Sequence, residues 1–195
     1  MTELNSNIAR KAMIDSQLRT SGVNDEYVLA RMNSVPREDF VPESVKAIAY
    51  IDRAVPVGDG DFLCPPVVHG KMLAEAAPTK DDRVLVINGG TSYFAELIRP
   101  LVADVQSIGA KDVLNQKGRE KFSLIVVEGA IEEVPSNLAK QLDEGGRIVT
   151  GLVLRDVTRL ATGRKVAGTV ALQPIADIGI PVLHEFDQAE AWSFS

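Results

Sequence analysis

A short glycine-containing turn is the feature of this chain best suited to ligand chemistry. The stretch from Arg83 to Leu101, RVLVINGGTSYFAELIRPL, predicts a buried strand, a turn and then a helix. That order is typical of the first turn of a nucleotide-binding α/β fold, where glycines let the backbone approach a ligand. Here the glycines are few and no carboxylate ends the strand. The turn is therefore either a cofactor site or a strand-to-helix connection that binds nothing.

Three other side chains are candidates for chemistry. Cys64 lies just before a predicted helix, a position that can lower the pKa of a thiol, although a lone cysteine is also commonly a small buried residue. We expect His69 to be partly exposed on another face of that helix, so a Cys–His nucleophile pair is not predicted. Glu128 ends the strand FSLIVVEG, at the edge where α/β ligands bind; helix capping or a surface position is the alternative.

Composition excludes several classes of function. The chain has 195 residues, 45% of them apolar and 25% charged, with a net charge of −6 and one cysteine. This balance, without a Lys/Arg cluster, argues against nucleic-acid or anionic membrane partners. Two histidines and one cysteine are a poor set of metal ligands, so no metal site is predicted. A polar N-terminus and a single thiol favour a cytoplasmic protein without a signal peptide or membrane span.

The elements that must position these residues form an α/β domain. We expect one domain over 1–195, with a helical layer over 1–78 and a sheet core over 79–195. In the layer, Ile8, Ala12, Ile14 and Leu18 form an apolar stripe. Buried strands that alternate with helices indicate a parallel sheet. The predicted helices are 6–20, 24–35, a short helix after a prolyl turn within 35–52, the segment 64–77 with its helix entered through Pro66, 91–103 and 134–145. The predicted strands are 83–88, 104–109, 122–129 and 146–154, followed by an antiparallel hairpin around Gly163 and a last strand over 189–195.

Four phrases point to a known family. They are DSQLRTSGV from Asp15, VPREDFVPE from Val35, AYIDRAVPVGDG from Ala49 and LDEGGRIVTGL from Leu142. Together with the order of elements, they resemble the protein-L-isoaspartate O-methyltransferase family. The resemblance implies a Rossmann-like fold that binds S-adenosylmethionine. It also implies protein repair, in which a methyl group is transferred to isoaspartyl carboxylates of damaged proteins or peptides.

This chain departs from the family pattern at the cofactor motifs. The family turn is like VLEIGxGxGY, and its carboxylate is Val86 here. The first glycine becomes Asn88, the second is kept as Gly90, and the third becomes Ser92. We expect Asn88 to keep the turn because asparagine tolerates left-handed φ. The acid that binds the ribose of the cofactor is replaced by Gly109.

The substrate side and the length of the chain also differ from the family. Cys64 stands at the family's serine position, which makes it the candidate catalytic residue, and Phe62 stands at the threonine position. Glu128 stands where the family often has a small or polar residue near the substrate. Asp104 and Asp112 lie near the missing ribose acid, but we expect them to be surface charges. Only twelve residues, 110–121, separate two strands. They are too few for a further strand and two helices, which predicts a shortened sheet.

Three functional hypotheses follow. The favoured one is a relative with a degenerate cofactor site and weak or no catalysis, that is, a pseudoenzyme acting through binding or assembly. The alternative is an active S-adenosylmethionine-dependent methyltransferase of isoaspartyl residues. The third is a different activity in the same cleft, with Cys64 and Glu128 as its reactive groups. A shortened sheet also predicts an exposed apolar surface, which a homodimer would cover.

Overall fold

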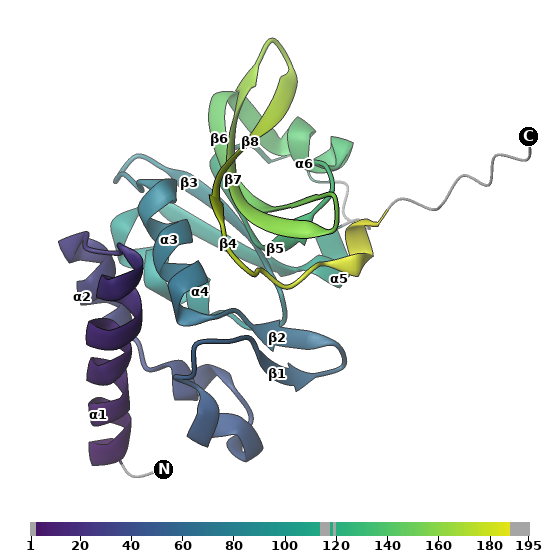
Figure 1. Cartoon of the computed structure of the whole chain (residues 1–195). Coiled ribbons are helices and arrows are strands. Elements are labelled where there is room, and N and C mark those ends of the chain that lie inside the picture. Colours follow the sequence, from purple (N-terminus) through teal and green to yellow (C-terminus); the bar gives the residue numbers. More distant parts are fainter. Residues whose placement is uncertain (1–2, 114–117, 119, 188–195) are drawn as a thin grey trace, which may run out of the picture.

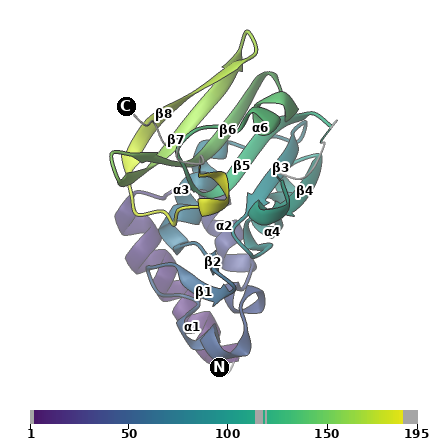
Figure 2. The same ribbon diagram turned by 90° about the vertical axis from the view of Figure 1, so that its right-hand side faces the viewer.

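A six-stranded sheet forms the centre of the computed structural model, which describes residues 3–113, 118 and 120–187. The strand order is β4-β3-β5-β6-β7-β8, and β1 and β2 form a separate two-stranded sheet. The N-terminal helices lie on the opposite side of the molecule from β6–β8 (Figures 1 and 2). The strands are β1 Val55–Gly58, β2 Asp61–Leu63, β3 Arg83–Asn88, β4 Asp104–Gly109, β5 Phe122–Ile131, β6 Leu142–Leu154, β7 Val157–Val166 and β8 Thr169–Asp177.

Short helices connect and cover these strands. The α-helices are α1 Glu3–Met13, α2 Glu26–Ser34, α3 Pro66–Ala76, α4 Tyr93–Ile98, α5 Ala110–Val113 and α6 Ser136–Gln141. A π-helical turn spans Ile14–Leu18, and 3-10 turns span Arg19–Ser21, Arg37–Phe40, Glu43–Ile48, Arg99–Leu101 and His184–Phe186. Among the described residues, no helix has the length and apolar character that crossing a membrane requires.

Apolar runs place β3 and β5 at the centre of the sheet. Both strands are buried over most of their length, and they pair in parallel, with Val86 beside Val126. One face of the sheet packs on α2, α3 and α4, and the other on α5, α6 and the turn at 184–186. The first apolar cluster joins residues from the N-terminal layer and from the strands. The predicted α/β fold with a helical layer and C-terminal antiparallel strands is confirmed.

The sheet ends at β4, as the short segment 110–121 predicted. Helix α5 follows β4 directly, and β5 begins at Phe122. Within the described residues no strand lies beyond β4. Its exposed side chains include Asp104, Gln106 and Ser107, so the predicted apolar surface is not found on this edge.

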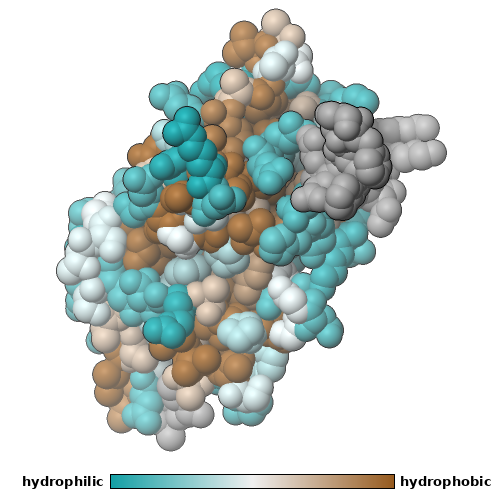
Figure 3. Space-filling view, turned by 45° about the vertical axis from the view of Figure 1, so that its right-hand side comes forward, coloured by the Kyte–Doolittle hydropathy of each residue, from teal (hydrophilic) through white to brown (hydrophobic). Residues whose placement is uncertain are grey.

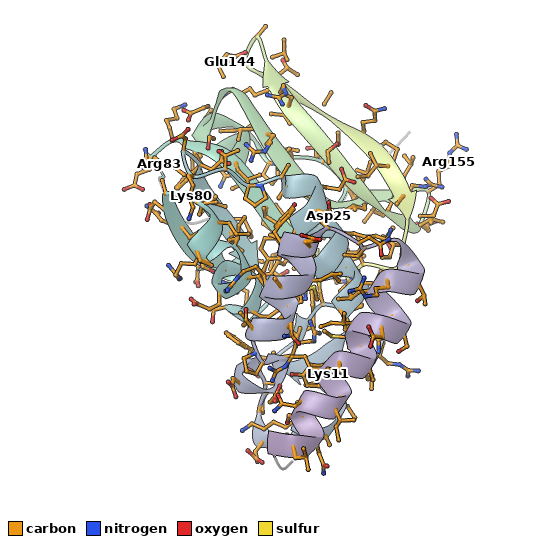
Figure 4. The ribbon with its side chains drawn as sticks, turned by 90° about the vertical axis from the view of Figure 1, so that its left-hand side faces the viewer. Lys11, Asp25, Lys80, Arg83, Glu144 and Arg155 are labelled. Atoms are coloured by element: carbon orange, nitrogen blue, oxygen red, sulfur yellow. The ribbon has the colours of Figure 1, made fainter. Side chains whose placement is uncertain are left out.

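The C-terminal hairpins differ from the prediction in their turns. The β7–β8 turn is at Ala167 and Gly168, both with positive φ. Gly163 lies inside β7 opposite Leu172, so the predicted turn there is wrong. Hydrophobic residues gather at the tip of this hairpin, where Val166 is 65% exposed (Figure 3). Glu144 lies near the start of β6, and Arg155 directly follows its end (Figure 4). The predicted strand at 189–195 lies outside the described residues.

The N-terminal helix departs from the predicted stripe. Ile14 and Leu18 are buried as expected, but Ile8 is 60% exposed and Ala12 is also exposed. The π-helical turn at Ile14–Leu18 uses more residues per turn than an α-helix. It therefore shifts the inward-facing positions relative to a regular helical period.

Other element boundaries also differ from the prediction. The sequence predicts a loop or a short extended piece over 53–61, whereas Val55–Gly58 and Asp61–Leu63 form the two strands of the β1–β2 hairpin. The last helix covers only Ser136–Gln141, and β6 begins at Leu142, four positions before the predicted strand. Helix α3 begins at Pro66 as predicted.

Candidate functional site

The candidate site lies where β3, β4 and β5 end at the same edge of the sheet. Asn88 at the end of β3 pairs with Gly109 at the end of β4. Val86 lies two positions earlier, and its side chain is fully buried between the sheet and its covering helices. The structure therefore brings Asn88 and Gly109 together as predicted, but it places Val86 in the core.

Asn88 shapes the turn through its side chain. Its Oδ1 accepts a hydrogen bond from the N–H of Gly90 at 3.1 Å, and its Nδ2 donates to the Ser107 hydroxyl at 2.9 Å. Gly90 has a φ of 116°, whereas Asn88 is not among the residues with positive φ. The prediction that Asn88 keeps the turn by adopting left-handed φ is wrong. The side-chain amide of Asn88 holds the turn instead, through its hydrogen bonds to Gly90 and Ser107. Ser92 lies just before α4, is exposed and makes no capping bond.

The β1–β2 hairpin packs directly on the glycine turn. The N–H of Phe62 donates to the carbonyl of Gly89 at 2.7 Å. A Cβ at Gly89 would lie 2.7 Å from the Phe62 ring, and one at Gly90 would overlap Cβ of Asp61. Real Cβ contacts are not that short, so both positions require glycine. Because Gly89 and Gly90 have no side chains, the β1–β2 hairpin of the same chain packs in the space beside them.

A lysine joins the hairpin to α5. Nζ of Lys111 donates to the Asp59 carbonyl at 2.8 Å and to Asp61 Oδ1 at 2.7 Å. Beside this contact is an open pocket of about 490 Å³, which is lined by Asp39, Phe40, Val41, Pro42, Val57, Gly58, Asp59, Asp61, Gly90, Thr91 and Ser92.

A buried arginine organises the interior below the hairpin. Arg37 is fully buried and donates to the Ala49 carbonyl at 2.7 Å and the Cys64 carbonyl at 2.6 Å. Its Nη1 lies 3.0 Å from Nδ1 of His69, and its guanidinium lies 5.0 Å from the centre of the Tyr93 ring. Arg37 was not predicted to be a site residue, although it lies within the phrase VPREDF that carried the resemblance.

His69 connects this arginine to Glu128. Because a guanidinium only donates hydrogen bonds, Nδ1 of His69 accepts, and the imidazole proton lies on Nε2. Nε2 then donates to Glu128 Oε1 at 2.8 Å. His69 is fully buried and Glu128 is 2% exposed. His69 was predicted to be partly exposed, and a capping or surface role was weighed for Glu128. Both predictions are wrong, because the face of α3 that carries His69 packs against the sheet.

Burial sets the protonation of this network. Burial, together with the Arg37 charge, lowers the pKa of His69 well below its usual value. Burial raises the pKa of Glu128 well above its usual value, although Arg37 opposes that shift. Oε2 of Glu128 and the hydroxyl of Tyr93 have no hydrogen-bond partner among the described residues.

The sequence places the chain within a known family. The family model of protein-L-isoaspartate(D-aspartate) O-methyltransferases matches residues 8–123, more than half of the chain. The chain belongs to this family. The Methanoculleus marisnigri protein-L-isoaspartate O-methyltransferase is 30% identical, with 91% of this chain and 92% of the relative aligned. The Opitutus terrae protein of the same name is 34% identical over 72% of this chain and 71% of its own length.

Two solved structures share the fold. A Plasmodium falciparum protein described as a protein-L-isoaspartate O-methyltransferase, crystallised with S-adenosyl-L-homocysteine, superposes with a TM-score of 0.71. It is 17% identical, with 92% of this chain and 98% of that chain covered. Another protein-L-isoaspartate O-methyltransferase superposes at 0.70, with 19% identity and with 89% of this chain and 65% of that chain covered.

Cys64, which the resemblance to the family predicts to stand at the serine position, lies inside this closed region. It is 1% exposed, and its Sγ lies 3.7 Å from the Glu128 carbonyl. Burial and the nearby Glu128 charge raise the pKa of the thiol well above its usual value. A protonated, enclosed thiol is a poor nucleophile, which counts against a thiol-based activity. No cluster of three or more potential metal ligands occurs in the described ranges.

Proposed function

We propose that this chain is a protein-L-isoaspartate O-methyltransferase relative with a degenerate cofactor site, which acts through binding rather than through methyl transfer. The observation that carries the proposal is the packing of Asp61 and Phe62 against Gly90 and Gly89. The family resemblance assigns this turn to the cofactor. Here the chain's own side chains lie against it at contact distance.

The polar groups that would hold S-adenosylmethionine are also missing at the family positions. Val86 is a buried aliphatic residue where the resemblance implies a carboxylate. Gly109 offers no side chain where the resemblance implies the ribose acid. A charge-assisted hydrogen bond contributes about 1.5–3 kcal/mol, so each loss would weaken binding by roughly one to two orders of magnitude.

The edge of the sheet supports the same conclusion. The resemblance implies a further strand beside β4 that reads the adenine, whereas β4 is the last strand of the described sheet. The residues present at this edge do not fit S-adenosylmethionine in the way that the family resemblance implies. We therefore derive no methyl-transfer step for this chain.

One contact favours the alternative, an active isoaspartyl methyltransferase. Oδ2 of Asp112 would lie 3.4 Å from a Cβ built on Gly109. A carboxylate therefore lies beside the position of the missing ribose acid, although it belongs to α5 rather than to β4. Under this alternative, Asp112 binds the ribose hydroxyls and the substrates are isoaspartyl proteins or peptides.

Calorimetric titration with S-adenosylhomocysteine and S-adenosylmethionine, up to millimolar concentration, separates the two functions. The Methanoculleus marisnigri relative serves as the reference protein. We expect no binding heat and no thermal shift for this chain, because its cofactor site is degenerate. A ligand that does bind, present at 100 times its Kd, would instead stabilise the native state by about 2.7 kcal/mol. Micromolar binding would refute the degenerate site. In that event, an Asp112→Asn variant with weaker binding, and methylation of an isoaspartyl peptide, would establish the alternative.

A further inference from the structure

The β1–β2 hairpin makes few backbone hydrogen bonds to the rest of the molecule, although Val55 and Leu63 at its base are fully buried in the core and act as its anchor. Its two strands pair only with each other and not with the six-stranded sheet. In the described residues, the backbone hydrogen bond that joins hairpin residues 55–63 to the sheet region runs from Phe62 to Gly89. A two-stranded hairpin is marginally stable by itself. Segments with few backbone bonds to the core are those that open locally before the whole protein unfolds.

The tip of the hairpin is held by a side chain. Gly58, Asp59 and Gly60 have φ values of 117°, 53° and 83° and form the turn between the strands. Lys111 reaches this tip from α5, bonding the Asp59 carbonyl and the Asp61 carboxylate. Lys111 lies in the short segment that replaces the longer family connection, and α5 follows the edge strand β4. The contact thus ties the tip of the hairpin to α5.

The closed hairpin covers the interior of the site. Phe62 lies against Gly89, and Cys64 follows β2 and lies against the Glu128 backbone. The Glu128 oxygen without a partner is buried in the same region. Displacing the hairpin would expose the glycine turn and the thiol together.

We propose that the β1–β2 hairpin is a lid that opens independently of the rest of the fold, with Lys111 as its latch. In the closed state the lid separates Gly89, Cys64 and Glu128 from solvent. In the open state the buried part of the carboxyl edge of the sheet, at Gly89 and Glu128, becomes accessible as well. The inference does not depend on whether S-adenosylmethionine binds, since it concerns access to the edge and not its occupant.

Cys64 provides a direct measurement because it is the only cysteine of the chain. The rate of its alkylation by iodoacetamide under native conditions reports how often the thiol is exposed. Local opening exposes little surface, so the rate should depend only weakly on low urea concentrations, whereas global unfolding depends steeply on urea. We expect slow labelling of the wild-type protein, with that weak dependence on urea.

Substitution of the latch tests the role of Lys111. We expect Lys111→Ala to accelerate labelling about five-fold, the upper range for losing an exposed ion pair, and Lys111→Arg to restore a rate close to the wild type. Arg99→Ala is the matched control. It breaks the ion pair between Arg99 and Glu96, whose side chains are 52% and 40% exposed. The side chains of Lys111 and Asp61 are similarly exposed, at 48% and 32%. The control should leave the rate of labelling unchanged.

Phe62→Ala adds a second, independent test at the other attachment of the hairpin. It should accelerate labelling more than the loss of global stability accounts for. The rates of Cys64 alkylation in all variants could simply follow their free energies of unfolding. Cys64 would then react only through global unfolding, the hairpin would be a fixed part of the core, and the lid would be refuted. If Lys111→Ala behaves like Arg99→Ala, the latch is refuted.

Discussion

Glu128 accepts a hydrogen bond from His69 at 2.8 Å, although 59 positions separate the two residues. His69 in turn accepts from Arg37, so a cation and a carboxyl group are joined through one imidazole in the interior. A buried ionic group is costly unless it is paired. This network therefore makes the protonation of Glu128 a determinant of stability.

Glu128→Gln tests that protonation. A carboxyl whose pKa is higher in the folded than in the unfolded state favours folding in its protonated form. This contribution is lost as the pH rises from the ordinary value of 4.5 through the raised one. We expect the free energy of unfolding of the variant, minus that of the wild type, to increase as the pH rises above the ordinary value of 4.5. Urea denaturation at several pH values measures it.

The opposite slope would show that Arg37 stabilises an ionised Glu128. The exposed position Glu96 provides the control, since it forms a surface pair with Arg99. Glu96→Gln should change the free energy of unfolding by less than about 1 kcal/mol.

Asp82→Asn should destabilise the fold at neutral pH. The Asp82 carboxylate accepts hydrogen bonds from Arg147 at 2.7 and 3.0 Å and from Ser123 at 2.6 Å. Although burial alone would raise the pKa of Asp82, these bonds and those from Thr79 hold it well below its ordinary value of 3.8. Removing one partner of such a pair costs about 3 kcal/mol.

The pH dependence of the Asp82 effect has a defined sign. A depressed pKa stabilises the folded state above the unfolded value, and this contribution is lost as the pH falls through the folded value. The difference between wild type and Asp82→Asn should therefore shrink below about pH 4. A difference that stays constant down to about pH 2 would assign the effect to packing rather than to charge.

Gly90→Ala should displace the hairpin. The position has a φ of 116°, and the new Cβ would overlap Asp61. The backbone strain alone costs of order 1–3 kcal/mol. We expect thermal unfolding at a lower temperature and faster alkylation of Cys64. Gly145→Ala, at a positive φ with no atom within 4 Å, is the control for strain without overlap. Equal Cys64 labelling in the two variants would contradict the close packing of Asp61 on Gly90.

Binding of the cofactor product should be recoverable. Phe62→Ala removes the ring from Gly89, and Gly109→Glu restores a carboxylate at a position where a Cβ meets only Asp112 Oδ2, at 3.4 Å. We expect the double variant to bind S-adenosylhomocysteine at least about tenfold more tightly than the wild type, as one charged hydrogen bond allows. Calorimetry of both single variants separates the two contributions. No gain in any variant would mean that the shortened sheet, rather than these residues, prevents binding.

The sequence predicted the sheet better than the interior of the site. The apolar run Val84–Ile87 and the twelve-residue connection at 110–121 are local features, so they indicated the buried strand and the early end of the sheet. The burial of His69 and Glu128 depends on contacts between distant segments, which no local period reveals. Arg37 was missed for the same reason, because an arginine in a prolyl turn ordinarily indicates a solvated surface.

The burial of Arg37 has a consequence for the order of folding. The guanidinium of Arg37 donates hydrogen bonds to Ala49, Cys64 and His69, which belong to the first 78 residues, whereas the carboxyl group linked to it through His69 is Glu128. During synthesis, the N-terminal layer would thus enclose a cation with no acidic partner until β5 has left the ribosome. The helical layer and the sheet should therefore fold together, and a fragment ending at residue 78 should not acquire its native packing.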